Sequence, residues 1–315
     1  MMSSLYKSLL LPCFFLSSAS FAQTFKVVPL GVKGGIDESN LSAYMVAPYA
    51  SNSYICLDAG TLHAGIQKAI DRKVFKVPVE QVLKQYVKAY FISHSHLDHL
   101  GGLIINSPED TSKTIYANAD CIDVFKNNYF TWKAWANFAN EGEKPQLSKY
   151  RYQVLMPGNE VNVAGTNLKV QAFVLSHSNL QSTAFLVNSN NNYLLYLGDT
   201  GPDEIEKSQN LQKLWQSVAP LIKAGQLKAL MIEVSFPNQQ PDKTLFGHFT
   251  PAWLMKEMNK LSQLTGVVAL QKVNMVITHV KPPQSHILRI KEQLKTGNNM
   301  HLKLIFPEQG KMMKF

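Results

Sequence analysis

Residues 94–99 read His-Ser-His-Leu-Asp-His, and this run decides how the whole chain is interpreted. Three imidazoles and a carboxylate in one short run are costly to bury unless a partner compensates them. The apolar run Ala89–Ile92 predicts a buried strand before the motif, and Gly101 and Gly102 allow a close-packed turn into a helix after it. Functional groups often gather where a strand of an α/β sheet ends. Because imidazole and carboxylate bind zinc and similar metals, the run indicates a metal site.

The spacing inside the motif favours two metal ions. His94 and His96 lie two positions apart and can reach one ion from an extended segment. Asp98 and His99 lie beyond the bend and can reach a second ion. A solvated surface loop that happens to hold three histidines is the alternative, and the concentration of metal-binding residue types speaks against it.

Three further apolar runs end in a residue that can bind metal. His177 follows Val174-Leu175, Asp199 follows Tyr196-Leu197-Gly198, and His279 follows Val276-Ile277. One polar residue after a strand needs no special explanation, because loops are polar. Three of them, added to the first motif, predict a shared site at like ends of several strands.

The first 22 residues have the pattern of a secretory signal peptide. Lys7 precedes the apolar run Leu9–Leu16, and Ser20-Phe21-Ala22 supplies the small residues of a cleavage point. The apolar run is shorter than the roughly 20 residues that span a bilayer, and no later stretch predicts a membrane span. We therefore expect a leader over 1–22 and an exported protein, periplasmic or secreted.

Composition narrows the choice of partners. The net charge of +9 favours anionic substrates, but the lysines are scattered and no basic run alternates with aromatics, so nucleic acid is not an expected partner. After removal of the leader two cysteines remain, Cys56 and Cys121, which we interpret as buried thiols, with a disulfide as the alternative. The assembled form, monomer or homodimer, is left open.

The order of predicted elements indicates an α/β fold. Early strands follow one another closely, whereas later strands alternate with helix-length amphipathic patterns, which suits two packed sheets with helices outside. The helical patterns cover His63–Ile70, Ala119–Phe125, Glu204–Gln216, Ala252–Leu264 and Gln284–Leu294. No linker or repeat divides residues 23–315, so we expect a single catalytic domain there.

The motifs resemble, in kind and order, the five motifs of the metallo-β-lactamase fold, here Asp58, residues 94–99, His177, Asp199 and His279. The resemblance implies a four-layer αβ/βα sandwich, with two mixed sheets packed face to face and helices outside. It also implies a two-metal centre at one edge of the sheets. Asp58 would orient the ligand loop, as outer carboxylates commonly do, or it is simply a turn aspartate before Gly60.

The same resemblance assigns the metal ligands. It implies that His94, His96 and His177 hold a first Zn²⁺. It further implies that Asp98, His99 and His279 hold a second Zn²⁺ and that Asp199 bridges the two ions, with Mn²⁺ or Fe²⁺ as other metals that such ligands accept.

A longer stretch, His94 to Pro108, resembles the signature of class II 3′,5′-cyclic-nucleotide phosphodiesterases. The likeness extends over most of the chain and includes the segments 30–35, 38–44, 129–138, 233–238 and 246–251. One departure is Ala136, where the family pattern has a proline, so we expect the local shape of that segment to differ from the pattern. The resemblance implies hydrolysis of cyclic AMP, cyclic GMP or both to nucleoside 5′-monophosphates. A β-lactamase or lactonase, an RNA-processing nuclease and a non-catalytic binding protein are the alternatives.

Two zinc ions about 3.5–4 Å apart can share a hydroxide and clamp a phosphoryl group. Our hypothesis is that this bridging hydroxide attacks phosphorus and that the 3′-oxygen leaves, with Asp98 and Asp199 as catalytic residues. His248 would contact the phosphate or protonate the leaving oxygen, or would only steady its loop. Expected substrate contacts are Asn40, Phe236, Asn238 and His248, whereas the aromatic segment 129–138 either stacks a base or forms core.

Overall fold

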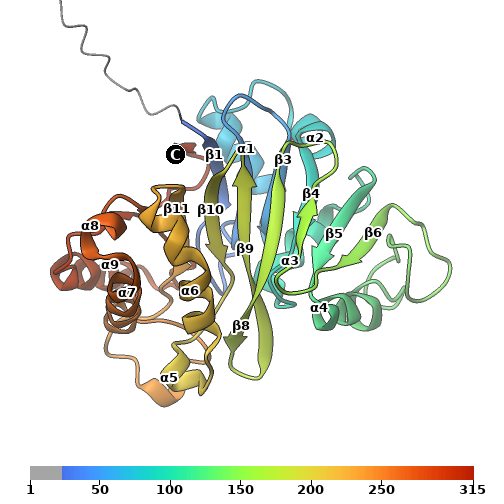
Figure 1. Cartoon of the computed structure of the whole chain (residues 1–315). Helices are drawn as coiled ribbons and strands as arrows, with labels where there is room; N and C mark the ends of the chain where they lie inside the picture. The colour runs from blue at the N-terminus through green and yellow to red at the C-terminus, as the bar shows by residue number, and fades with distance from the viewer. Residues whose placement is uncertain (1–22) are drawn as a thin grey trace, which may run out of the picture.

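The computed structural model describes residues 23–315, so the predicted leader lies outside the described residues. Two seven-stranded sheets form its centre (Figure 1). The first sheet has the order β14 (Met313–Lys314), β1 (Phe25–Gly31), β2 (Ala43–Pro48), β3 (Tyr54–Ala59), β4 (Val87–Phe91), β5 (Lys113–Ala117), β6 (Tyr150–Val154). The second has the order β13 (Lys303–Ile305), β12 (Asn274–Thr278), β11 (Leu227–Glu233), β10 (Asn192–Leu197), β9 (Leu180–Ser189), β8 (Lys169–His177), β7 (Glu160–Asn162).

Each sheet has an antiparallel half and a parallel half. In the first sheet β1, β2 and β3 pair antiparallel, and β3 to β6 pair parallel. In the second sheet β7 to β10 pair antiparallel, and β10 to β13 pair parallel. Because the carboxyl ends of parallel strands lie at one edge, the loops after them can build a common site.

Three apolar layers hold the sandwich together. The middle layer lies between the sheets and contains Phe91 from the first sheet and Phe185 from the second, whose rings meet at 5.5 Å between centroids. The two outer layers lie under the helices. Leu100 of one helix and Trp215 of another are each almost fully buried there. The predicted αβ/βα sandwich is therefore the fold observed.

The helices cover the outer faces of both sheets (Figure 1). Those by the first sheet are α1 (His63–Asp71), α2 (Val79–Gln81), η1 (Val82–Tyr86), α3 (Leu97–Asn106), α4 (Ala119–Val124) and η2 (Phe125–Tyr129). Those by the second are α5 (Asp203–Glu206), α6 (Asn210–Lys223), η3 (Asp242–Thr244), α7 (Pro251–Thr265), α8 (Val267–Leu270) and α9 (Gln284–Gly297). Among these described helices, none has the length and apolar character needed to cross a bilayer.

One helix prediction was wrong. The pattern over Glu204–Gln216 predicted a continuous helix, but the structure has α5 and α6 with a break between them. Lys207 adopts a left-handed conformation with φ of 52°, which ends α5. The Asp203 carboxylate then accepts hydrogen bonds from the backbone N–H groups of Leu211 and Gln212 in the first turn of α6. These two bonds start α6 as a separate helix, because a side chain that accepts backbone N–H groups offers them an alternative to a continuous helix.

Candidate metal centre

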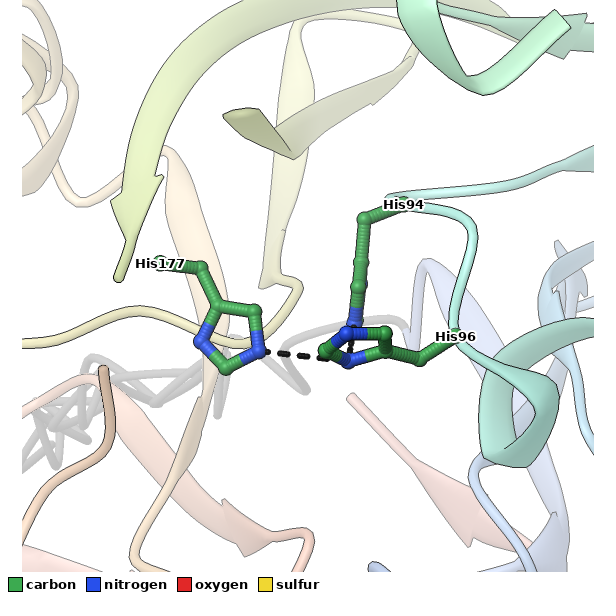
Figure 2. Close-up of side chains that lie close together, drawn as sticks. All are labelled: His94, His96 and His177. Atoms are coloured by element: carbon green, nitrogen blue, oxygen red, sulfur yellow. Dashed lines mark hydrogen bonds between the residues drawn. The ribbon is translucent and has the colours of Figure 1, made fainter. Parts of the chain in front are cut away.

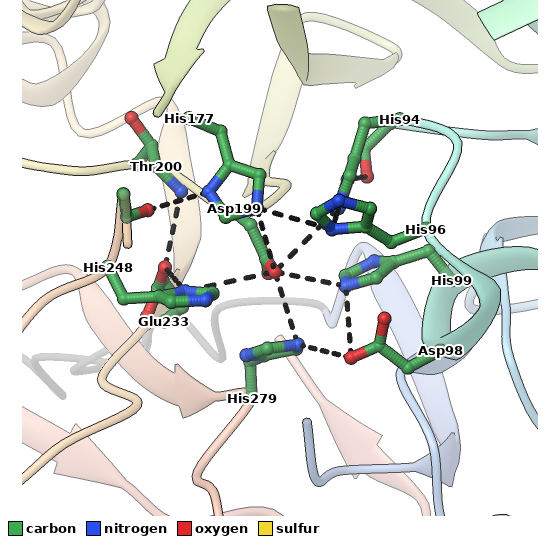
Figure 3. A network of polar contacts seen from close by, with 12 residues as sticks. His94, His96, Asp98, His99, His177, Asp199, Thr200, Glu233, His248 and His279 are labelled. Atoms are coloured by element: carbon green, nitrogen blue, oxygen red, sulfur yellow. Dashed lines mark hydrogen bonds and ion pairs between the residues drawn. The ribbon is translucent and has the colours of Figure 1, made fainter. Parts of the chain in front are cut away.

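The predicted ligand residues meet at one edge of the two sheets (Figure 3). The motif 94–99 follows β4 and runs into α3, and His177 is the last residue of β8. Asp199 follows β10, and His279 follows β12. Four segments that are far apart in the sequence therefore place their side chains in one space.

The first group of ligands consists of three histidines (Figure 2). His94 Nε2 lies 3.1 Å from His96 Nδ1, and that same nitrogen of His96 lies 3.4 Å from His177 Nε2. His94 and His177 are buried, whereas His96 is exposed. Three ring nitrogens that converge this closely on one point form the ligand type that a divalent ion requires.

The second group consists of Asp98, His99 and His279. Asp98 Oδ2 lies 3.1 Å from His279 Nε2 and 3.9 Å from His99 Nε2. Asp199 lies between the two groups. Its Oδ2 is 3.2 Å from Nε2 of both His99 and His279, and 3.8 Å from Nε2 of His94.

The state of His99 tests whether these residues fit a metal ion. The ring is fully buried, and among residues 23–315 its Nε2 finds no hydrogen-bond partner despite its closeness to Asp199. A buried nitrogen without a hydrogen-bond partner is costly unless another group receives its lone pair. The donor set of imidazoles and carboxylates is the one that zinc, manganese and iron prefer, so the residues fit a divalent metal.

Asp58 orients His99 by binding Nδ1, the ring nitrogen that does not face Asp199. Its carboxylate lies 2.7 Å from His99 Nδ1 and accepts hydrogen bonds from the Ser93 backbone N–H at 2.7 Å and from the Tyr196 hydroxyl at 2.5 Å. If His99 carries its proton on Nδ1, toward Asp58, its Nε2 lone pair faces the site. Such carboxylate–histidine pairs commonly orient metal ligands. Asp58 therefore contacts both the ligand loop, through Ser93, and the ring of His99.

Burial and neighbouring charges set the protonation of the ligands. Burial lowers the pKa of His94, and it lowers the pKa of His177 to about 4. Burial opposes a charge on His99 too, but Asp199, Asp58 and Asp98 together outweigh it and raise the pKa of His99. Burial disfavours the charged form of Asp199, yet the histidines around it hold its pKa well below the usual range. His94 and His177 are thus held neutral and Asp199 ionised, the forms in which these side chains bind metal, whereas His99 would have to give up a proton when an ion binds.

Gly34 and Gly35, in the loop after β1, lie against the second group of ligands. The Gly35 backbone N–H donates to Asp98 Oδ2 at 2.8 Å. A Cβ atom built at Gly34 would lie 2.1 Å from Cε1 of the His279 ring, so only glycine allows this approach. The loop that follows β1 thus contacts two ligands of the second group.

The sequence of the chain matches the family model of class-II cAMP phosphodiesterases over residues 22–310. The chain belongs to this family. The match confirms the predicted enzyme class, 3′,5′-cyclic-nucleotide phosphodiesterase, over a β-lactamase, a lactonase, a nuclease or a non-catalytic binding protein.

Similar sequences agree with this family, and solved structures share the fold of the chain. A 3′,5′-cyclic-nucleotide phosphodiesterase of Aliivibrio fischeri is 43% identical over 307 residues, which cover 93% of each chain. A probable 3′,5′-cyclic-nucleotide phosphodiesterase of Yersinia pestis is 41% identical over 328 residues, 99% of this chain and 96% of the relative. The crystal structure of unliganded yeast PDE1 has a TM-score of 0.83 at 21% identity and covers 93% of this chain and 100% of its own. The metallo-beta-lactamase fold protein YhfI from Bacillus subtilis, with a TM-score of 0.62 at 16% identity, covers the same shares and shows the same fold.

The predicted substrate-contacting residues of this phosphodiesterase differ in where they lie. Phe236 is half-buried and packs edge-on against His248, with 5.7 Å between ring centroids. Asn40 Oδ1 accepts from the Val32 backbone N–H within its own loop. Asn238 is exposed, and its Oδ1 accepts from Ala252 N–H at the start of α7. Phe236 and His248 therefore lie together beside the ligand groups, whereas the side-chain oxygen of Asn40 stabilises its own loop and that of Asn238 binds the start of α7.

Glu233, the last residue of β11, is a functional residue that motif analysis did not single out. Its Oε1 lies 2.6 Å from His248 Nδ1 (Figure 3). Its Oε2 accepts from the Ser235 hydroxyl at 2.7 Å. Ser235 Oγ also lies 2.9 Å from His279 Nδ1. The buried carboxylate of Glu233 therefore positions His248 directly and His279 through Ser235. Its place at a strand end, like that of Asp199, was the signal that could have identified it.

The aromatic segment 129–138 divides between two positions. Phe130 is buried in the core under the first sheet, and Phe138 packs against it with 6.3 Å between ring centroids. Trp135 Nε1 donates to Ser107 Oγ, and the Tyr129 hydroxyl donates to the Ser95 carbonyl inside the histidine motif. These contacts favour a packing role for the segment and give Tyr129 a part in holding the ligand turn.

Proposed function

We propose that this enzyme hydrolyses cyclic AMP, cyclic GMP or both to nucleoside 5′-monophosphates at a centre of two divalent metal ions, with zinc as the expected metal. One observation carries the proposal. Ring nitrogens of His94, His177, His99 and His279 all lie within 3.8 Å of a single oxygen, Asp199 Oδ2. Family membership supports the substrate class.

The two groups of side chains would hold one ion each, and Asp199 would contact both. The first ion would bind His94, His96 and His177, and the second would bind Asp98, His99 and His279. Divalent ions bound there neutralise the charge of a phosphodiester and make a nucleophile available from water at neutral pH. Mn²⁺ or Fe²⁺ could replace Zn²⁺, since the ligand types suit all three.

The residues around the ligands would orient the substrate. Glu233 holds Nδ1 of the His248 ring, and the Lys281 ammonium lies 2.8 Å from its Nε2. His248 would contact the phosphate or protonate the 3′-oxygen as it leaves only once Nε2 parts from Lys281, and otherwise it would steady its loop. Phe236 beside it offers an aromatic face for the base. A His248→Asn variant with unchanged kcat and KM would remove His248 from the mechanism.

A comparison of substrates tests the proposal. The purified enzyme is loaded with Zn²⁺ and assayed with cyclic AMP, with cyclic GMP and with a chromogenic cephalosporin, and the nucleotide product is identified by chromatography. We expect turnover of a cyclic nucleotide to the 5′-monophosphate and none of the cephalosporin. Asp98→Ala should lower the metal content and reduce turnover by orders of magnitude, and near-normal activity in this variant would exclude the two-metal scheme.

We also propose that the enzyme acts outside the cytoplasm, in the periplasm or the medium, where it would meet extracellular cyclic nucleotide. The leader-like pattern of residues 1–22 supports this location. Cell fractionation and sequencing of the mature N-terminus test it, with Gln23 as the expected first residue. Retention of Met1 in the active protein would contradict it. Gel filtration of the same material would distinguish a monomer from a homodimer.

A further inference from the structure

A lysine lies beside His248, on the loop that carries the ligand His279. The Lys281 ammonium nitrogen is 2.8 Å from His248 Nε2, and it lies over the Phe236 ring at 5.1 Å from the centroid. The Lys281 backbone N–H donates to the Ser235 carbonyl, and the residue as a whole is half-buried. Its charged group is therefore held in place next to the proposed substrate-contacting residues.

The direction of the hydrogen bonds follows from the chemistry of the side chains. A lysine ammonium has three donors and no acceptor, so it must donate to His248 Nε2. The ring proton of His248 is then on Nδ1, which donates to Glu233 Oε1 at 2.6 Å. In this arrangement both ring nitrogens of His248 are engaged, and Lys281 is the residue of the three that still has N–H groups to donate.

Neither contact of the Lys281 side chain neutralises its charge. An imidazole nitrogen and an aromatic ring are both uncharged partners, and within residues 23–315 no carboxylate oxygen lies within 4.0 Å of the Lys281 nitrogen. By contrast, Lys33 in the loop after β1 pairs with Asp37 at 2.8 Å. Lys281 thus has an unpaired charge and two unused donors beside the ligand groups.

We propose that Lys281 binds the phosphate of the cyclic nucleotide, donating to a non-bridging oxygen while it keeps its bond to His248. The inference rests on the proposed function, since it assigns a residue to the substrate of that site. A cyclic phosphodiester carries one negative charge, and lysine binds phosphate as a point charge. The phosphate would then be held between the metal ligands on one side and Lys281 on the other.

Three substitutions separate this role from a purely structural one. Lys281→Arg keeps the charge, Lys281→Gln keeps a donor for His248 Nε2 but loses the charge, and Lys281→Met loses both. If Lys281 binds phosphate, the glutamine and methionine variants should both lose roughly 10- to 100-fold in kcat/KM, and arginine should restore most of it. If Lys281 only positions His248, the glutamine variant should resemble the wild type and only methionine should be impaired.

A binding measurement gives an independent readout. The affinity of each metal-loaded variant for the product 5′-AMP is measured by calorimetry, together with its metal content. We expect unchanged metal content and binding that is roughly 10-fold or more weaker in Lys281→Gln. Lys256→Gln is the matched control, because Lys256 also lies over an aromatic ring, that of Trp253, but its charge is paired with Glu204 at 2.6 Å, and the variant should bind 5′-AMP as the wild type does.

Failure of the proposed role of Lys281 can be distinguished from failure of the proposed function. If the wild-type enzyme does not hydrolyse cyclic nucleotides, the proposed function fails first. If the wild type is active and Lys281→Gln matches it in both kcat/KM and 5′-AMP affinity, only the role of Lys281 is overturned.

Discussion

Substitution of Gly34 by alanine tests whether the loop after β1 sets the geometry of the second ligand group. Gly34 is buried against the ring of His279, and its backbone does not adopt the positive φ of its neighbour Gly35 (86°). Alanine is therefore compatible with the backbone at position 34. The conflict is between the new methyl group and the ring, because the Cβ would lie 2.1 Å from Cε1 and 2.4 Å from Nδ1 and Nε2 of His279.

The size of the required movement follows from these distances. Ordinary van der Waals contact begins at 3.4 Å, so the His279 ring or the loop must retreat by about 1.3 Å. The ring is also held by Ser235 and Asp98, and the loop by the bond from Gly35 to Asp98. Metal–ligand distances tolerate only about 0.2 Å. We expect the metal content to fall from two ions toward one per chain and kcat/KM to fall roughly 10- to 100-fold.

The assay is metal analysis after dialysis, combined with steady-state hydrolysis of cyclic AMP. Gly101→Ala is the matched control, because this glycine lies next to the histidine motif on α3 and a Cβ there would meet no atom within 4 Å. The control should keep full metal content and activity and should gain about 0.5–1 kcal/mol of stability. Full metal content and wild-type turnover in Gly34→Ala would refute this reasoning about the loop.

Three further predictions concern the same structure. Asp58→Asn removes the charged acceptor of His99 and should weaken metal binding or activity by roughly 10- to 100-fold, and metal titration with wild-type affinity would contradict this. Removal of metal by a chelator should abolish activity and lower the melting temperature, because a ligand present at 1,000 times its Kd stabilises the folded state by about 4 kcal/mol. Added Zn²⁺ should restore both, and an unchanged melting temperature would count against a metal in this site. Within residues 23–315 Cys56 and Cys121 form no disulfide and are buried, and burial raises the pKa of both thiols. Neither should therefore react with a thiol reagent at pH 8 until the protein unfolds, and immediate labelling of the native protein would overturn this prediction.

The residues proposed as metal ligands could be found in the sequence because each follows an apolar strand run that is recognisable by itself. The motif 94–99, His177, Asp199 and His279 all have this signal, and the structure brings them together. The strands β6, β7 and β14 are short or partly exposed and lie at the edges of the sheets. Their apolar pattern is correspondingly weak.

The contacts around the ligands could not be predicted, because they join segments that are distant in the sequence. Glu233 acts on His248, which lies 15 residues away, and Gly35 donates to Asp98 across 63 residues. Gly34 is one of 17 glycines, and nothing local distinguishes it from the others. Lys281 likewise is one of many scattered lysines until the fold places it against His248. Such positions are visible only when the packing of the two sheets is known.

The central claim is that two neighbouring metal ions are held by side chains from four loops, and anomalous diffraction from crystals of the zinc-loaded enzyme tests it most directly. The account predicts two peaks, one among His94, His96 and His177 and one among Asp98, His99 and His279, with Asp199 between them. A single peak, or peaks away from these residues, would contradict it.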